Sequence, residues 1–256
     1  MSFNVSADAY ARFMGRYSEP LARHFAELAE VRAGQRVLDV GCGPGALTAV
    51  LVQRSATVTA VDPSESFIAA IRARLPEVDV PRGVAEHLPF AADSFDATLA
   101  QLVVHFMTDP VAGLSEMARV TRPGGRVAAS VWDHAGGSGP HGTFWRAARE
   151  LDPTAPDESD LPGAREGHLA RLCAEAGLTQ IEPGALTVTV GFPTFAAWWE
   201  PYTFGVGPAG AYVAALDPEQ REALRTRCVQ LLPAAPFEIS ATAWCVRALA
   251  SVAEGG

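Results

Sequence analysis

Three glycines and one carboxylate stand at a spacing that suits the binding of a nucleotide. Gly41, Gly43 and Gly45 directly follow an apolar run at residues 37–40, and a helix is expected to begin next. Glycine lets the backbone pass close to a ligand, and the first turn of a helix offers it free N–H groups. Asp62 ends a second apolar run about 20 residues on, as in the nucleotide-binding turn of doubly wound α/β folds. The spacing therefore predicts a nucleotide-type cofactor.

These residues lie in a stretch where strands and helices are expected to alternate. Strands are predicted near residues 36–40, 57–62, 79–84, 94–101 and 126–132, with helices near 45–54, 64–74 and 109–120. Alternation at this spacing is typical of a parallel sheet with helices on both faces. We therefore expect residues 34–133 to form a cofactor-binding core of the α/β class.

The segments on either side of this core are predicted to cover it. Residues 8–31 show apolar helical spacing, so residues 1–33 should form a helical cap, in which Pro20 would start a second helix. After residue 133, helices are expected near 143–151, 165–176 and 218–232, and strands near 178–190 and 237–248. Residues 192–235 are an aromatic- and proline-rich insertion before the last strand. We interpret this insertion as a substrate lid within a single domain that covers residues 1–256.

Composition narrows the class of partner and the compartment. The 256 residues carry a net charge of −9 without a cluster of basic residues, which argues against a nucleic-acid partner. The sequence contains no apolar run long enough to span a membrane, and its start lacks the pattern of a secretory signal. The four cysteines form no C-x-x-C pair and the six histidines follow no metal-binding spacing, so no metal site is predicted. We expect a cytoplasmic protein, either a monomer or a homodimer.

Five segments, taken in chain order, resemble a class I S-adenosylmethionine-dependent methyltransferase of the small-molecule type, such as those of ubiquinone and menaquinone biosynthesis. They are residues 37–45, Asp62, and residues 84–90, 94–101 and 120–125. The resemblance implies a doubly wound, Rossmann-like sheet of seven strands, mostly parallel, whose last strand runs antiparallel. It also implies that the chain binds S-adenosyl-L-methionine and releases S-adenosyl-L-homocysteine.

The resemblance assigns the cofactor contacts to loops at the carboxyl ends of the strands and to the N-terminal helix. The residues it implies are Arg16, Asp39, Gly41, Cys42, Gly43, Asp62, Pro63, Ala85, Glu86 and Gln101. The two oxygens of Asp62 would accept hydrogen bonds from the ribose hydroxyls, and Glu86 would lie at the adenine edge. Gln101 would lie beside the reacting methyl group. Arg16 would close over the cofactor carboxylate or remain a solvated surface charge.

His105, four positions beyond Gln101, is the candidate catalytic residue. An imidazole with a near-neutral pKa can accept a proton from a hydroxyl or an amine of the methyl acceptor. The competing interpretation is a packed, hydrogen-bonding histidine in the loop after the strand. His134 and His141, in the next loop, have weaker claims.

The predicted reaction is a direct in-line displacement, in which a substrate atom attacks the sulfonium methyl group and the protein mainly aligns the reactants. The aromatic insertion favours a small, hydrophobic acceptor. A non-catalytic S-adenosylmethionine-binding protein of the same fold is a first alternative. An NAD(P)-dependent oxidoreductase is a second, because Gly41-x-Gly43-x-x-Ala46 also satisfies the dinucleotide fingerprint. Against the second, Asp39 occupies a strand end where dinucleotide folds prefer an apolar residue; it would contact the ammonium group of the methionine moiety or cap the loop.

Overall fold

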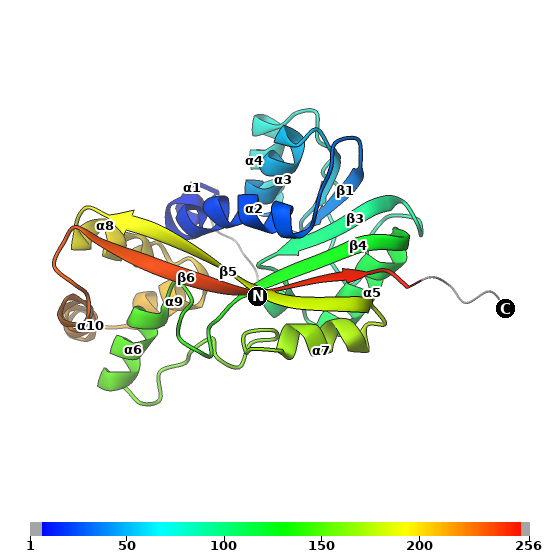
Figure 1. The fold of residues 1–256 in the computed structure, drawn as a ribbon. Helices are drawn as coiled ribbons and strands as arrows, with labels where there is room; N and C mark the ends of the chain where they lie inside the picture. Colours follow the sequence, from blue (N-terminus) through cyan, green and yellow to red (C-terminus); the bar gives the residue numbers. More distant parts are fainter. Residues whose placement is uncertain (1–6, 252–256) are drawn as a thin grey trace.

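The computed structural model describes residues 7–251 and centres on one twisted sheet with helices on both faces (Figure 1). Six strands follow the spatial order β2-β1-β3-β4-β6-β5. Their bounds are Arg36–Val40 (β1), Thr57–Val61 (β2), Phe95–Gln101 (β3), Thr121–Trp132 (β4), Thr179–Phe192 (β5) and Phe237–Leu249 (β6). β1 to β4 run parallel, and β6 runs antiparallel to both of its neighbours. The sheet is doubly wound and Rossmann-like, and its last strand is antiparallel as predicted.

The strand expected near residues 79–84 does not form a regular strand in the part of the chain that the structure describes. Asp79 and Arg82 instead pair with Thr59 and Asp62, at the edge formed by β2, through two isolated bridges. Pro81 lies between the bridges and has no N–H to donate, so a regular ladder cannot continue through it. The sheet therefore has six regular strands rather than the predicted seven.

The helices that alternate with the strands form two outer layers. They are α2 (Arg16–Leu28), α3 (Ala46–Gln53), α4 (Glu65–Arg74), α5 (Pro110–Val120) and α7 (His168–Glu175). Apolar residues of α2, α3 and α4 join one buried cluster with the sheet, and those of α5 and α7 join a second. Val37 and Leu38 of β1 belong to different clusters, because successive side chains of a strand point to opposite faces. The sheet is thus buried on both faces.

The N-terminal helical segment is continuous but not uniform. It comprises α1 (Ala7–Tyr10), a π-helical turn η1 (Ala11–Gly15) and α2, and Pro20 lies inside α2. The prediction that Pro20 starts a second helix is therefore wrong. The wider π turn already interrupts the regular i→i−4 hydrogen-bond ladder just before α2, which lets a proline follow within about one turn.

β5 and β6 extend past the rest of the sheet and carry a helical insertion between them (Figure 1). The elements of this cap insertion, residues 193–236, are α8 (Phe195–Trp199), the 3-10 turn η3 (Glu200–Phe204), α9 (Gly207–Ala215) and α10 (Pro218–Leu231). α10 packs on α6 (Gly142–Leu151), which follows β4, and η3 contacts η1. The insertion therefore joins the N-terminal helices to the segment after β4.

The described residues also give three observations on metals, disulfides and membranes. Residues 7–251 contain no group of three or more His, Cys, Asp or Glu side chains that could hold a metal ion. Cys42, Cys173, Cys228 and Cys245 are buried and free. None of the helices in the same range is long and apolar enough to cross a membrane.

Candidate active site

The loop between β1 and α3 passes through backbone conformations that glycine adopts most readily. Gly41, Gly43 and Gly45 have positive φ angles of 66°, 54° and 91°. A Cβ on Gly41 would lie 2.5 Å from a methyl carbon of Val103, whereas a Cβ on Gly43 would meet no atom within 4 Å. Gly41 therefore lets the loop pack against the residues that follow β3, and Gly43 leaves open space at the carboxyl edge of the sheet.

Asp62 fastens this loop to the end of β2. One of its carboxylate oxygens accepts the N–H of Gly43 (2.9 Å), and the other accepts the N–H of Ser64 (2.8 Å). Burial raises the pKa of Asp62 against the opposing effect of these two backbone donors. Each oxygen keeps a further lone pair, so the carboxylate can still accept hydrogen bonds from a ligand.

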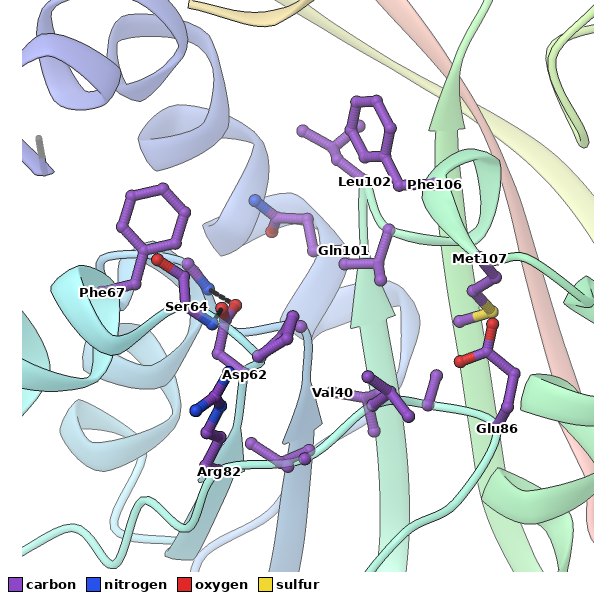
Figure 2. Close-up of a pocket in the computed structure, with 18 of the residues that line it drawn as sticks. Val40, Asp62, Ser64, Phe67, Arg82, Glu86, Gln101, Leu102, Phe106 and Met107 are labelled. Atoms are coloured by element: carbon purple, nitrogen blue, oxygen red, sulfur yellow. Dashed lines mark hydrogen bonds between the residues drawn. The ribbon is translucent and has the colours of Figure 1, made fainter. Parts of the chain in front are cut away.

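A cavity of about 500 Å³, here called the cofactor cavity, opens at the carboxyl ends of β1, β2 and β3 (Figure 2). Small-molecule sites in proteins have volumes of roughly 300–1,000 Å³. The predicted cofactor residues that line it are Gly41, Gly43, Asp62, Pro63, Ala85, Glu86 and Gln101. Figure 2 shows Asp62 on one side of the cavity and Glu86 on the other. The fold thus brings together residues that are up to 60 positions apart in the chain (from 41 to 101).

A smaller cavity of about 30 Å³ adjoins the first at the glycine loop. The predicted residues that line it are Asp39, Gly41, Cys42, Gly43 and Gln101. The Asp39 side chain is buried and accepts a hydrogen bond from Thr48 Oγ1 (2.6 Å). Burial raises the pKa of Asp39 to about 7, and the bond from Thr48 lowers it in part. Asp39 therefore gains a proton readily unless a positive charge lies beside it.

Gln101 presents a buried acceptor atom to the same region. Its Nε2 donates to the carbonyl oxygen of Ser18 (2.9 Å), while its Oε1 is buried without a hydrogen-bond partner among residues 7–251. Buried polar atoms are normally paired, so an orphaned oxygen at a cavity indicates a missing donor. An ammonium group supplies that donor, and the carboxyl of Asp39 suits its charge. The residues present therefore fit a nucleoside that carries an amino-acid group.

Glu86 ties the opposite wall of the cofactor cavity to the start of α5. Its Oε1 accepts the N–H groups of Thr108 (2.7 Å) and Asp109 (3.3 Å). Ala85, beside it, is buried in the cluster that includes α5. The placement is compatible with the predicted contact at the adenine edge, and that contact stays a prediction.

Arg16 lies elsewhere: it is not among the residues that line the two cavities. Its Nη1 donates to the carbonyl oxygen of Ala197 in the cap insertion (3.0 Å), and its Nε donates to the carbonyl oxygen of Arg12 (2.9 Å). The guanidinium carbon lies 5.0 Å from the centroid of the Phe192 ring. Arg16 therefore joins the N-terminal helix to the cap insertion in this structure, and its contact with the cofactor carboxylate stays a prediction.

His105 belongs to a 3-10 turn, η2 (Val104–Phe106), and lines a third cavity of about 30 Å³ rather than the cofactor cavity. We call this third space the histidine cavity, since His105, His134 and His141 all line it. Burial holds the pKa of His105 well below its ordinary value, so the ring is neutral at pH 7. Glu158 lines the same cavity. It could not be predicted from the sequence, because it lies in a polar loop without a motif.

The cofactor cavity also contains residues that were not predicted. Phe67, Arg82, Phe106 and Met107 line it and are drawn in Figure 2. Arg82, Phe106 and Met107 lie at the same edge of the sheet as the predicted residues. Their position in the chain, next to strand ends at this edge, was the signal that could have identified them. Their residue types alone give none.

Comparison with known proteins agrees with this geometry. Residues 38–129 match the family model described as a methyltransferase domain. The chain is 40% identical over 133 residues to an uncharacterized methyltransferase of Mycobacterium tuberculosis, and this match covers 52% of each chain. It is 31% identical over 170 residues to a demethylmenaquinone methyltransferase of Paenarthrobacter aurescens, which covers 59% of this chain and 65% of that protein. The chain thus spans about half the length of the first of these curated relatives.

A solved structure extends the likeness across the chain. Phosphoethanolamine N-methyltransferase 2 of Haemonchus contortus, in complex with phosphomonomethylethanolamine and S-adenosylhomocysteine, superposes with a TM-score of 0.59 at 16% identity. The match covers 96% of this chain and 57% of that one. At this identity the likeness shows the fold alone, and the fold includes segments outside residues 38–129.

Proposed function

We propose that this chain, whose residues 38–129 are a class I S-adenosylmethionine-dependent methyltransferase domain, moves a methyl group from S-adenosylmethionine to a small, hydrophobic metabolite. One observation carries the proposal. The Asp62 carboxylate at the end of β2 and the Gln101 Oε1 at the end of β3, which has no hydrogen-bond partner within residues 7–251, both belong to residues that line the cofactor cavity, and they suit a nucleoside with an ammonium group.

Each predicted contact has a physical role in this proposal. Bound S-adenosylmethionine supplies an electrophilic methyl group on a positively charged sulfur. Asp62 accepts hydrogen bonds from the ribose hydroxyls, and Asp39 with Gln101 holds the ammonium group. Gly41, Cys42 and Gly43 let the backbone approach the methionine moiety. Pro63 packs on the adenine face, and Ala85 and Glu86 lie at its edge. The residues of the chain hold and align the reactants, which can remove on the order of 7 kcal/mol from a barrier.

The proposed acceptor is small and hydrophobic because the cap insertion is rich in aromatic side chains. Trp198, Trp199 and Tyr202 of the cap insertion are buried among the aromatic rings at that end of the sheet. The predicted lid, residues 192–235, overlaps the cap insertion except at its two ends, and it then covers the acceptor during the reaction. The net charge of −9 disfavours a nucleic-acid substrate.

A thermal-shift titration with S-adenosylmethionine, S-adenosylhomocysteine, NAD and NADP tests the proposal. A ligand that binds only the folded state at 100 times its Kd stabilises it by about 2.7 kcal/mol. Stabilisation by the two adenosyl compounds alone supports the cofactor, and stabilisation by NAD or NADP alone overturns it in favour of an oxidoreductase. Release of S-adenosylhomocysteine with an acceptor panel then separates an enzyme from a non-catalytic binding protein.

A further inference from the structure

The histidine cavity lies directly behind the cofactor cavity. Tyr10, Leu102 and Phe106 line both, so the two spaces share a wall. A volume of about 30 Å³ holds roughly one water-sized group, such as a hydroxyl. Val206 and Pro208 of the cap insertion also line it, so the insertion contributes to its wall.

Three residues that line this cavity each carry a buried polar atom without a hydrogen-bond partner within residues 7–251. The atoms are His105 Nδ1, His134 Nε2 and Trp132 Nε1. The two imidazole centroids lie 5.7 Å apart, and the His134 side chain is 4% exposed. Because buried polar atoms are normally paired, three orphaned atoms on residues that line one small cavity indicate a polar ligand group between them.

The third histidine of the cavity differs from the other two. His141 Nδ1 lies 3.1 Å from the hydroxyl oxygen of Tyr202, within hydrogen-bond distance. Its ring stacks on Phe13 with a centroid distance of 4.8 Å. His141 is therefore a packed residue that joins η1 to the cap insertion, and the ligand-directed atoms belong to His105 and His134.

Glu158 gives the cavity its charge. It is the one charged side chain among the described residues that line the cavity, and it is 4% exposed. Trp145 Nε1 donates to Glu158 Oε2 (2.8 Å), and the same oxygen lies 3.8 Å from His134 Nδ1. The carboxylate therefore faces the Nδ1 side of His134, which leaves Nε2 as the nitrogen that accepts a proton.

We propose that the histidine cavity receives the nucleophilic hydroxyl group of an uncharged aromatic acceptor, and that His134, positioned by Glu158, takes the hydroxyl proton. The inference rests on the proposed methyl transfer and deepens it. His134 is the catalytic residue, Glu158 is a positioning residue, and His105 Nδ1 and Trp132 Nε1 are the remaining polar contacts of the acceptor oxygen.

The step balances with these groups. Methyl transfer to the hydroxyl oxygen forms an O–C bond and breaks the C–S bond, whose electron pair stays on the sulfur and neutralises it. The hydroxyl proton passes to His134 Nε2. The imidazolium that results carries a proton on both nitrogens, and its Nδ1–H faces the Glu158 carboxylate, which compensates the positive charge.

The charges around His134 favour a neutral acceptor. The titratable groups that face it are Glu158, Asp133, Asp157, His105 and His141. Burial lowers the pKa of His134 more than the three carboxylates raise it, so the ring is neutral at pH 7 and can accept a proton. The negative Glu158 repels an anionic acceptor. It attracts an ammonium group, but an ammonium group has no free electron pair with which to attack.

Binding to the full chain in the presence of S-adenosylhomocysteine tests the acceptor class. The probes are 2-naphthol, 2-naphthylamine and 2-naphthoate, which share a ring system and differ in one group. We expect 2-naphthol to bind at least tenfold more tightly than 2-naphthoate, and Glu158→Gln to reduce this ratio to less than threefold. An equal or reversed ratio in the wild type, an unchanged ratio in Glu158→Gln, or no binding of any probe overturns the inference.

Methyl transfer to 2-naphthol as a function of pH tests the proton acceptor. His134→Asn keeps an N–H near the position of Nδ1 but lacks Nε2, and we expect it to lower kcat by 10²- to 10⁴-fold at pH 7. The loss should shrink as the pH approaches the pKa of the naphthol, since an ionised acceptor needs no base. Glu158→Gln should shift the acidic limb of the profile to lower pH, because it removes a charge that raises the pKa of His134.

Glu150→Gln is the matched control, because Glu150 pairs with Arg227 on α10 and its side chain is partly exposed. It should leave the binding ratio and the pH profile unchanged. Preferential methylation of 2-naphthylamine, or a His134→Asn profile that parallels the wild type, overturns the inference. Failure of S-adenosylhomocysteine to bind the wild type instead overturns the proposed function itself, so the two failures are distinguishable.

Discussion

Around the cofactor cavity the stabilising contacts are mostly backbone bonds of the strand-end loops, whereas around the histidine cavity they are side-chain contacts between distant segments. Asp62 holds the N–H groups of Gly43 and Ser64, and a cavity of about 500 Å³ stays open beside them. Near the histidine cavity, the rings of Phe144 and Tyr202 stack with a centroid distance of 4.5 Å. The histidine cavity itself has a volume of about 30 Å³. We call the region around the cofactor cavity the cofactor side and the region around the histidine cavity the acceptor side, after the roles proposed above. The first contains a large open cavity, and the second has room for about one water-sized group.

The two sides also differ in the type of titratable group that they bury. Burial raises the pKa of Asp39 and Asp62 on the cofactor side, and it lowers the pKa of His105 and His134 on the acceptor side. Carboxyls of this kind are stabilised by a cationic ligand, whereas neutral imidazoles are suited to accept a proton. Under the proposed roles, one fold holds one site suited to bind a positive charge and another suited to accept a proton.

Removing the buried carboxyl of Asp39 should have the largest effect on stability. The pKa is about 7 in the folded chain against 3.8 for an ordinary Asp, so the folded state holds a proton that the unfolded chain has released between these values. The contribution of Asp39 to the unfolding free energy of the cofactor-free protein should therefore fall as the pH rises from about 4 to about 7, by about 4 kcal/mol at 1.36 kcal/mol per unit. The buried histidines, whose pKa is lowered, contribute in the opposite direction, so the Asp39 contribution is the difference between the wild type and a variant that lacks this carboxyl. Urea denaturation at several pH values measures this slope.

Asp39→Asn cannot ionise and keeps an acceptor for Thr48 Oγ1. It should lose the Asp39 contribution to the pH dependence and be more stable than the wild type at pH 8. An equal pH dependence of the unfolding free energy in the two proteins would show that Asp39 does not titrate with a raised pKa in the folded state. The acceptor side gives the contrast, since its neutral histidines carry no such charge at pH 8.

Two glycine substitutions should separate folding from binding on the cofactor side. Gly41→Ala adds contact with Val103 to a left-handed backbone, and we expect an unfolding free energy lower by about 3 kcal/mol. Gly43→Ala has the same backbone strain but open space around its Cβ, so it should lose only about 1 kcal/mol. Its larger effect should be a weaker affinity for S-adenosylhomocysteine.

The double variant Gly41→Ala/Val103→Ala should recover part of the stability that Gly41→Ala loses, because it removes the contacted methyl groups. Calorimetric titration and urea denaturation of the single and double variants measure both quantities. Equal losses of stability at the two glycines would contradict the geometry of the loop.

Asp62→Ala should weaken the binding of S-adenosylhomocysteine by about 100-fold, because bonds of a ligand to a charged group are worth about 1.5–3 kcal/mol each. The substitution also frees the N–H groups of Gly43 and Ser64. Glu77→Gln, an exposed acid after α4, is the control and should change the affinity by less than about twofold. A small effect of Asp62→Ala would move the nucleoside away from the end of β2.

The cofactor side could be predicted from the sequence because its constraints are local. Positive φ at Gly41, Gly43 and Gly45 demands glycine, and the distance to Asp62 follows from one strand–helix–strand unit. The seventh strand was the exception. Residues 79–84 stand where a strand should follow the second helix of the alternation, but Pro81 removes the hydrogen-bond donor that a ladder needs, and pairing stops at isolated bridges.

The acceptor side could not be predicted, because its contacts join segments that share no local pattern. Glu158 meets Trp145 and His134 only after the loop that follows α6 folds back. The same reason applies to Arg16, whose partners Ala197 and Phe192 lie about 180 residues away. A motif fixes a turn, but it does not fix which distant side chains cover a cavity.

Arg16→Ala should have the smallest effect. It tests whether contacts to the cap insertion influence the affinity of the cofactor side for its ligand. Loss of the bond to Ala197 and of the contact with Phe192 should cost about 1 kcal/mol at this half-buried position. Affinity for S-adenosylhomocysteine should change by less than about threefold. Arg12→Ala, which removes an exposed ion pair with Glu200 and a contact with the Phe204 ring, is the matched control and should cost less stability because the Arg12 side chain is more exposed. A loss of affinity of tenfold or more in Arg16→Ala alone would mean that Arg16 leaves the cap insertion for the cofactor carboxylate, so that cofactor binding itself opens the acceptor side.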